Sequence, residues 1–439
     1  MPVSLFSSQV HAGLFSDDEL LPLLDDAGDV AQMVRFEQAL AVVQGRLGII
    51  PADAANTIDR QLQDAAMEPE GLAEGTRSAG VPVPALVATL RKITGEDAGK
   101  WLHWGATSQD VIDTAQMLQA KACLDILEAR LDRLIDTLET RSNQNAEQLL
   151  AGRTRSQVST PVTLGYRIAQ WAQPLIDAKN DLAALRASAL RVQFGGASGV
   201  NSAIAPDGTL VARALAAELG LEDGPSWHVN RTPLLHLAAW LQRVSTALAK
   251  MAGDLIVMGR TDIAEVSSGT GGGSSTMPQK SNPVQAETIL VLNQIANLSQ
   301  SGLAAASDPL EERDGTKWPL EWMMLPQAFM AAGSALRHAQ ALSDSMHTNA
   351  KHLDATVAAN PELMAETASF VLAKAGLPRA EAKDLVARAA SDSAPFAEAL
   401  NKLSPLKIDW QTALDPRLVI EPCREMSRRI FARRTTGRD

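Results

Sequence analysis

Aromatic residues and basic charge are scarce in this sequence. Only 4% of the 439 residues are aromatic, with a single tyrosine, which argues against a surface on which nucleobases stack. The formal net charge is -11 at pH 7, so no global basic field exists to hold phosphates. We therefore expect no nucleic-acid partner. An acidic protein that handles an anionic substrate must gather its cations locally.

Cysteines and long apolar runs are also few. Cys123 and Cys423 have no second Cys or His nearby at metal-ligand spacing, so neither a disulfide scaffold nor a zinc site is expected. No run of about 18 apolar residues predicts a membrane span. The first residues, Met1–Phe6, lack a basic segment followed by an apolar stretch, so no secretory signal is expected. These shortages predict a cytoplasmic protein without a membrane partner.

Helical periodicity dominates what is present. Apolar residues recur at alternating steps of three and four from Leu234 to Met258 and from Leu124 to Leu138. Alternating strand patterns are nearly absent. Five long helices are predicted, over about 110–150, 161–191, 234–258, 283–303 and 319–343. Helices of this length need partners along their whole length, so we predict an all-α fold with a long central bundle.

The length and two changes of composition predict three helical domains. A chain of 439 residues is too long for one simple core. The composition of the sequence changes near Val81–Pro84, before the first long predicted helix. It changes again near Asn360–Pro361, after which the predicted helices become short. We predict an N-terminal domain over 1–100, a central long-helix bundle over 101–353 and a C-terminal domain over 354–439.

The stretch Ser267–Pro283 carries the most chemical information. Its first half is glycine and hydroxyl residues, which flex readily. Its second half leads into a helix, with Asn282 as a candidate N-cap and Pro283 at the first helical position. Lys280 would lie beside a helix N-terminus, where anions are favoured. This pattern is typical of a mobile loop that carries Ser274 to a carboxylate substrate. For a glycine run alone, a flexible surface linker is the more common explanation.

Two further blocks place polar groups beside predicted helix ends. In His103–Asp110, Thr107 and Ser108 start a long helix and suit a carboxylate, although a plain helix cap explains them as well. The second block, Gly152–Gly165, is rich in arginine and hydroxyl residues. Both blocks supply local cations or N–H donors in an acidic chain.

Together these blocks resemble the fumarase/aspartase superfamily. The glycine stretch matches its Gly-Ser-Ser-x-Met-Pro-x-Lys-x-Asn-Pro signature, and the other two blocks occur in the family's order. The resemblance spans nearly the whole chain and is weakest after about residue 350. It implies a catalytic Ser274 supported by Ser275, and a homotetramer whose sites are shared between subunits. The substrate-binding residues that it implies are His103, Thr107, Ser108, Arg153, Arg155, Gln157, Thr160, His228, Arg231, Lys280, Asn282 and Arg313.

Arg155 departs from the family pattern. Many lyases of the family carry His at this position, facing a Glu seven residues after the signature Lys, which is present here as Glu287. A guanidinium keeps its proton, so Arg155 is suited to bind a carboxylate or to pair with Glu287 rather than to shuttle protons. Carboxymuconate cycloisomerases also lack this His. The segments Gln193–Gly199 and Trp227–Arg231 look like that branch, although tight turns or structural side chains explain each segment alone.

The resemblance to this branch implies a reaction of protocatechuate catabolism. A carboxylate oxygen of a tricarboxylate diene adds across a double bond, and protonation of a carbon by Ser274 completes a lactone. No cofactor or metal is needed. Three alternatives stay open: a lyase that eliminates fumarate, as adenylosuccinate lyase does, a non-catalytic structural protein, and a helical adaptor. Arg155 argues against the first, and the Ser274, Lys280 and Asn282 set argues against the others.

Overall fold

The structure is a computed structural model that describes residues 3–63, 65, 67–269, 271–273, 276–277 and 280–434. The chain forms two compact units. The first unit comprises Met1–Leu131, Ala178–Ala249 and Thr288–His338, and the second comprises Asp132–Asp177, Lys250–Glu287 and Ala339–Asp439. The three-domain division at residues 100 and 353 stays a prediction.

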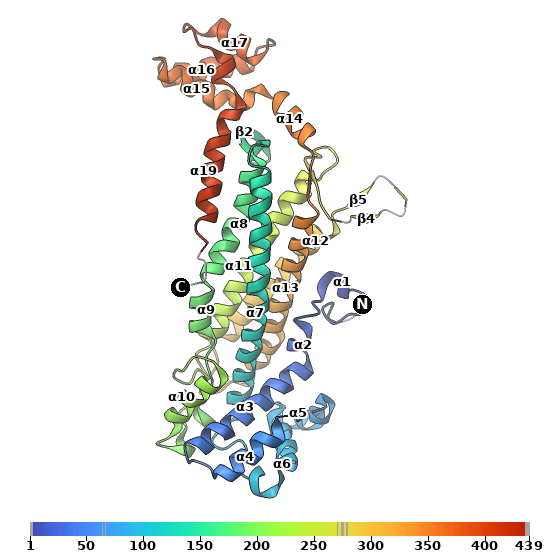
Figure 1. The fold of residues 1–439 in the computed structure, drawn as a ribbon, viewed down its shortest axis with the longest axis vertical. Helices are drawn as coiled ribbons and strands as arrows, with labels where there is room; N and C mark the ends of the chain where they lie inside the picture. The colour runs from blue at the N-terminus through green and yellow to red at the C-terminus, as the bar shows by residue number, and fades with distance from the viewer. Residues whose placement is uncertain are drawn as a thin grey trace. The chain divides into compact units, whose positions relative to one another are not determined.

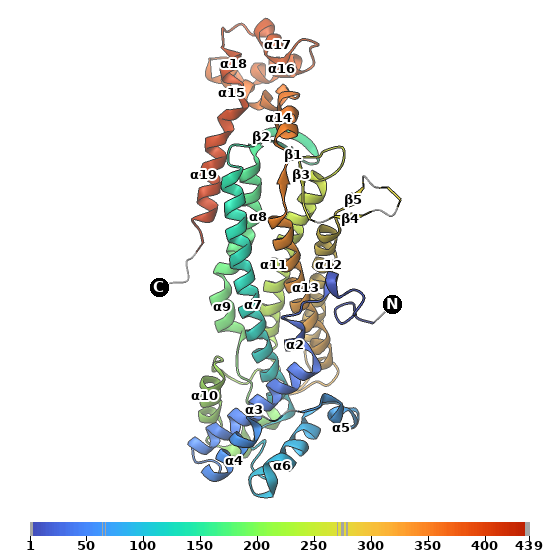
Figure 2. The same cartoon turned by 45° about the vertical axis from the view of Figure 1, so that its right-hand side comes forward.

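Long helices dominate the described chain, as the periodicity predicts. They are α7 (Ser108–Gln144), α8 (Leu164–Asn180), α11 (Thr232–Met258), α12 (Val284–Ala306) and α13 (Trp318–Asp344). In the first unit, the parts of α7, α11, α12 and α13 that belong to it run side by side (Figure 1, Figure 2). The apolar positions of the Leu234–Met258 pattern are all at most 4% exposed, because that face of α11 lies in the core.

Shorter helices complete the first unit. They are α1 (Ala12–Phe15), α2 (Leu21–Leu24), α3 (Asp26–Arg46), α4 (Ala52–Leu62), η1 (Pro69–Leu72), α5 (Ala73–Ala79), α6 (Val83–Gly99), α9 (Leu182–Ala189), η2 (Gly196–Ser198), η3 (Ser202–Ile204) and α10 (Gly208–Leu219). Helix α4 packs against both α3 and α6 (Figure 2). A Cβ on Gly45 of α3 would lie 2.3 Å from the Cβ of Ala55 in α4, so glycine is what allows this close approach.

The second unit contains the strands. They form three antiparallel pairs: β1 (Leu149–Thr154) with β2 (Gln157–Thr163), β3 (Val266–Ser267) with β6 (His347–Thr348), and β4 (Gly272–Gly273) with β5 (Ser281–Asn282). Its remaining helices are α14 (Ala350–Ala358), η4 (Pro361–Met364), α15 (Ala365–Lys374), α16 (Arg379–Ala390), α17 (Phe396–Leu403), α18 (Trp410–Ala413), η5 (Pro416–Val419) and α19 (Ile420–Phe431). Helices α15 to α18 enclose a small core that includes Leu372, Phe396 and Trp410.

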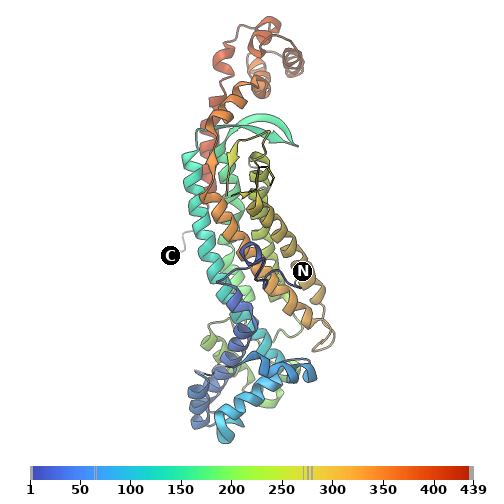
Figure 3. The same cartoon turned by 90° about the vertical axis from the view of Figure 1, so that its right-hand side faces the viewer.

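Two of the predicted helix ranges were wrong at their ends. The helix predicted over 110–150 ends at Gln144, and the one predicted over 161–191 begins at Leu164 and is interrupted at Asp181. The reason is the β1–β2 hairpin (Figure 3), whose second strand holds the β-branched residues Val158, Thr160 and Val162. No described helix is both long enough and apolar enough to cross a membrane.

Candidate functional site

In the first unit, Asp110 organises the start of α7. Its Oδ2 accepts a hydrogen bond from the backbone N–H of Thr107 at 3.0 Å, which makes Thr107 and Asp110 a capping pair at the helix start. The N–H groups of Ser108 and Gln109 have no acceptor in the described part of the chain. Unpaired N–H groups at the positive end of a helix favour a carboxylate, as the sequence predicts for this block.

The same carboxylate also holds the glycine segment that follows α9. Asp110 Oδ1 accepts from Gly195 N at 2.8 Å, and Oδ2 accepts from Gly196 N at 2.9 Å. Both oxygens of this fully buried side chain are therefore saturated by donors. A Cβ on Gly195 would lie 2.5 Å from the Oγ of Ser226, so the close approach needs glycine. The segment Gln193–Gly199 thus lies against the beginning of α7.

His228 completes this cluster. Its Nε2 lies 2.9 Å from Asp110 Oδ1, and because a carboxylate only accepts, Nε2 carries the proton. Its Nδ1 is buried, faces Gly199 and has no hydrogen-bond partner among the described residues. The ring is 4% exposed, so a solvated surface histidine is excluded as an explanation. Asp110 fixes the ring in a single orientation beside the start of α7.

Arg313 joins the cluster from the segment before α13. Its Nε donates to Gln109 Oε1 at 3.2 Å and its Nη2 donates to the Ala197 carbonyl at 3.0 Å. Gln109 in turn donates to the carbonyl of His228 at 3.1 Å. A guanidinium has five N–H groups, so three remain for a ligand in the described chain. The half-buried Arg313 therefore keeps N–H groups that could bind an anion, and its role in substrate binding stays a prediction.

Arg231 has a different role from the substrate binding predicted for it. It is 3% exposed, and its five N–H groups donate to both oxygens of Asp113, to both oxygens of Glu321 and to the Trp227 carbonyl. Burial opposes its charge, but the two carboxylates outweigh burial and raise the pKa of the guanidinium. No N–H group is left for a substrate. We correct the prediction: Arg231 joins α7, α11 and α13 inside the first unit.

His103 is also paired within the first unit. Its Nδ1 donates to Oε1 of the buried Glu37 at 2.6 Å, and its backbone adopts a left-handed φ of 62°. Burial lowers the pKa of His103, but the Glu37 carboxylate more than offsets burial and the pKa is raised. His103 therefore holds the segment before α7 against α3, and its ring is 18% exposed.

In the second unit, the β1–β2 hairpin carries the arginine block. Arg153 forms a two-pronged ion pair with Glu265, at 2.9 Å from Nη1 to Oε2 and 2.6 Å from Nη2 to Oε1. The register shifts between Ala151 and Arg153, and a Cβ on Gly152 would lie 2.3 Å from the Thr160 carbonyl oxygen. Glycine is therefore required where the hairpin strands approach most closely. Arg153 keeps three N–H groups for a ligand, since two are used by Glu265.

Arg155 lies at the tip of this hairpin. Thr154 pairs with Gln157, so Arg155 and Ser156 form a two-residue turn with φ of 49° and 63°. Neither residue is glycine or asparagine, which are preferred where φ is positive, and strained backbone of this kind clusters at functional sites. Arg155 and Gln157 are exposed, and Thr160 is half-buried.

The structure does not join Arg155 to Glu287 within one chain. Both side chains are exposed, and among the described residues no hydrogen bond or ion pair involves the guanidinium of Arg155. A pairing with Glu287 of a neighbouring chain stays a prediction. Arg155 thus presents an uncompensated cation at the hairpin tip of the described chain.

The signature loop is described only in part. Ser274 and Ser275 lie outside the described residues. Gly272 pairs with Asn282 and Gly273 with Ser281, so part of the predicted flexible loop is a short ladder. Helix α12 begins at Val284 and the carbonyl of Pro283 accepts from Glu287 N at 3.0 Å, so Asn282 is not the N-cap. Lys280 is exposed.

Asp110 is the functional residue that sequence reasoning missed. It follows Thr107 by three residues, which is the spacing of a capping box with an acidic third residue. That signal predicts the bond to Thr107 N. It does not predict the three further bonds, because Gly195, Gly196 and His228 are distant in sequence.

Comparisons with known proteins identify the family of this chain. The profile of a family described as lyase matches residues 27–297. A 3-carboxy-cis,cis-muconate cycloisomerase of Acinetobacter baylyi is 33% identical over 376 residues, which cover 83% of this chain and 83% of the relative. A nitrosuccinate lyase of Streptomyces davaonensis is 31% identical over 424 residues, which cover 91% of this chain and 88% of the relative.

A solved structure shows the same fold. The crystal structure of the 3-carboxy-cis,cis-muconate lactonizing enzyme from Pseudomonas putida matches with a TM-score of 0.88 at 30% identity. The match covers 97% of this chain and 99% of that structure. The family profile, the relatives and the fold lead to one conclusion: the chain belongs to the fumarase/aspartase superfamily of lyases.

Proposed function

We propose that the chain is a 3-carboxy-cis,cis-muconate cycloisomerase that forms 4-carboxymuconolactone in protocatechuate catabolism. The relatives from Acinetobacter baylyi and Pseudomonas putida support this branch of the superfamily. The substrate carries three carboxylates, and in this acidic chain the exposed cations of the blocks that resemble the family are suited to hold them.

The observation that carries the proposal is the state of Arg155. It stands where many family lyases carry a histidine, it is exposed at a strained turn, and no carboxylate of the described chain neutralises it. A guanidinium binds a carboxylate with two parallel N–H groups and keeps its proton. This suits an enzyme that needs an additional anion-binding group more than one that needs a proton shuttle at this position.

The remaining groups divide the chemistry between them. The free N–H groups at the start of α7 and the free N–H groups of Arg313 bind carboxylates, and Lys280 adds a further cation. A substrate carboxylate oxygen forms a bond to one alkene carbon. The alkene electron pair moves to the carbon beside another carboxylate, which becomes an aci-carboxylate dianion.

Protonation completes the reaction. Ser274 donates a proton to that carbon, and solvent restores the serine proton, so substrate and product are isomers and no co-reactant is consumed. We propose that each site of a homotetramer gathers the three family blocks from different chains, as the family resemblance implies. His228, oriented by Asp110, would then lie beside the bound substrate.

A second candidate is an elimination within the same superfamily. The nitrosuccinate lyase relative, which matches over 91% of this chain, favours it. Such an enzyme would cleave a bond at the carbon next to a carboxylate and release an unsaturated acid. A non-catalytic structural role is the remaining alternative and predicts no turnover of any acid.

One assay separates these functions. Purified full-length protein is incubated with 3-carboxy-cis,cis-muconate, with nitrosuccinate and with adenylosuccinate, and the ultraviolet spectrum is followed. We expect loss of the diene absorbance with the first acid only, because lactonisation removes the conjugation. Turnover of either other acid in place of the first would assign an elimination, and inactivity with all three would support the structural role.

A further inference from the structure

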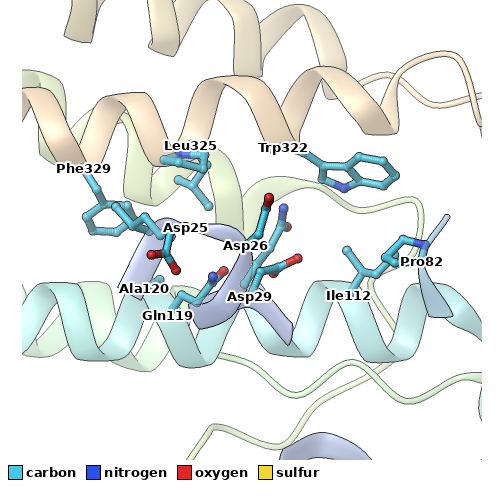
Figure 4. A pocket seen from close by; sticks show the side chains of 13 residues that line it. Asp25, Asp26, Asp29, Pro82, Ile112, Gln119, Ala120, Trp322, Leu325 and Phe329 are labelled. Atoms are coloured by element: carbon cyan, nitrogen blue, oxygen red, sulfur yellow. The ribbon is translucent and has the colours of Figure 1, made fainter. Parts of the chain in front are cut away.

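A cavity of about 210 Å³ lies in the first unit, apart from the cluster around Asp110. Figure 4 shows Asp25, Asp26 and Asp29 at the start of α3, between the ribbons of α7 and α13. The sequence patterns that point to the reaction include none of these carboxylates.

The polar groups that line the cavity are predominantly acceptors. Gln116 is 7% exposed, lines the cavity, and its Oε1 is buried without a hydrogen-bond partner among the described residues. The carboxylates of Asp26 and Asp29 add further acceptors, and Asp25 retains capacity beyond its bond to Gly28 N. An unpaired buried acceptor costs roughly 1–3 kcal/mol, so the site favours a ligand that donates hydrogen bonds.

The negative charge of the residues that line the cavity favours a cationic ligand. Three aspartates line the cavity, and no lining residue is Lys, Arg or His. Among the described residues, no group of three or more His, Cys, Asp or Glu side chains is arranged to hold a metal ion. A bare metal ion therefore does not fit, and a cation that carries its own N–H groups does.

The rest of the wall selects an organic ion of limited size. Ile112 of α7 and Leu325 and Phe329 of α13 supply apolar side chains to the cavity wall (Figure 4). The cavity volume of about 210 Å³ suits a ligand of a few carbon atoms. The Nε1 of Trp322 is also buried without a described partner, and an alkylammonium ion offers it no acceptor.

We propose that this cavity binds a small alkylammonium ion. The ammonium group donates to the Gln116 amide oxygen and to the Asp29 carboxylate, and the alkyl chain lies against Leu325 and Phe329. The ligand is a free amine. A lysine side chain from a second copy has the same chemistry, and if it filled the cavity a free amine would not bind.

The state of Asp29 makes the binding dependent on pH. Burial, with a smaller contribution from the charge of Asp26, raises the pKa of Asp29 to about 6. The other titratable group near it in the wall is Asp25, also on α3, and the lining residues of α7 and α13 carry none. An ammonium ion favours the ionised carboxylate, so affinity should rise about tenfold per pH unit below pH 6 and level off above it.

Calorimetric titration of the full-length protein with n-butylammonium tests the proposal. We expect one site per chain, no binding of n-butanol or butyrate, and affinity at least tenfold weaker in Asp29→Asn and in Gln116→Leu. Asp18→Asn, which removes an exposed carboxylate outside the cavity wall, should bind as the wild type does. Circular dichroism establishes that each variant is folded, and the pH dependence tests Asp29 in the unmodified protein.

Three results would overturn it. One is no binding at about 10 mM amine, a concentration at which even millimolar affinity is detected. The same result would follow if a lysine of a second copy filled the cavity. Another is equal binding of n-butanol, which would show an apolar cavity only. The last is unchanged affinity in both folded cavity variants.

Discussion

The buried carboxylate of Asp110 accepts a hydrogen bond from His228 Nε2 at 2.9 Å, across 118 positions of sequence. The same carboxylate accepts from the backbone of Thr107, Gly195 and Gly196. One side chain thus holds His228, the glycine segment and the start of α7 in fixed positions relative to one another. The geometry of the predicted carboxylate-binding groups in the first unit depends on this residue.

Replacing Asp110 by Asn should damage both stability and activity. The asparagine retains one oxygen, while its amide nitrogen would face donors, so one or two buried donors lose their acceptor. We expect a loss of about 2–4 kcal/mol in the free energy of unfolding and at least a tenfold fall in kcat/KM. Denaturant titration and steady-state kinetics measure the two effects. A variant that matches the wild type in both would remove Asp110 from the account.

Arg231 and Arg313 provide a matched pair of arginine substitutions. Arg231→Met should lower the free energy of unfolding by about 3–5 kcal/mol, because Asp113 and Glu321 would be left as buried charges without a cation. The measurement is a denaturant titration. Equal stability of this variant and the wild type would contradict the structural role assigned to Arg231.

Arg313→Met should instead act on the substrate. Its side chain is half-buried and neutralises no carboxylate in the described chain, so stability should change by less than about 1 kcal/mol. We expect KM for 3-carboxy-cis,cis-muconate to rise roughly tenfold or more, because a charged hydrogen bond to a carboxylate is lost. A normal KM in a folded variant would exclude Arg313 from substrate binding.

The pair of His103 and Glu37 should contribute stability that depends on pH. The folded pKa of His103 is raised above its ordinary value of 6.5. The ion pair therefore stabilises the fold fully below about pH 6.5, and this contribution is lost as the pH rises through the raised pKa. The stability gap between the wild type and Glu37→Gln should accordingly be larger at about pH 5.5 than at about pH 9.

Denaturant titrations at both pH values measure that gap. Glu70→Gln, at an exposed glutamate, is the control and should show a small gap that does not vary with pH. A gap for Glu37→Gln that stays constant, or that grows as the pH rises, would contradict the assigned direction.

Ser274 is predicted to be the proton donor. Ser274→Ala should lower kcat by about a hundredfold or more, a typical scale for loss of a general acid, with little change in KM. Lys280→Ala should raise KM and lower kcat together, because its charge contacts both ground and transition states. Steady-state kinetics distinguish the two patterns. Near-normal kcat in Ser274→Ala would exclude this serine from the mechanism.

The long helices were predictable, and the hairpin was not. The three-four alternation of apolar residues from Leu234 to Met258 predicts α11. The structure confirms this prediction, because each of these apolar residues is buried. The β1–β2 hairpin was missed because its first strand carries no alternation of apolar and polar residues, and because its turn uses Arg155 and Ser156 in place of the Asn-Gly that marks such turns.

The sequence motifs predict candidate members of the site, but they do not predict the contacts of these residues. Motifs identify Thr107, Arg153 and Arg313, because family blocks keep residue types at fixed spacing. The saturation of Arg231 by Asp113 and Glu321 could not be predicted, since those partners are separated from it by 118 and 90 positions. A buried arginine and a substrate-binding arginine look alike until the fold shows which carboxylates surround each one.

The most direct test of the proposed function is the product formed from 3-carboxy-cis,cis-muconate in D2O, observed by proton NMR. We predict 4-carboxymuconolactone that carries one solvent deuterium at the carbon protonated by the enzyme. In Arg155→His the same lactone should form more slowly, because a histidine binds a carboxylate more weakly than an arginine does. An unchanged diene after prolonged incubation, or a released smaller acid in place of the lactone, would contradict the account.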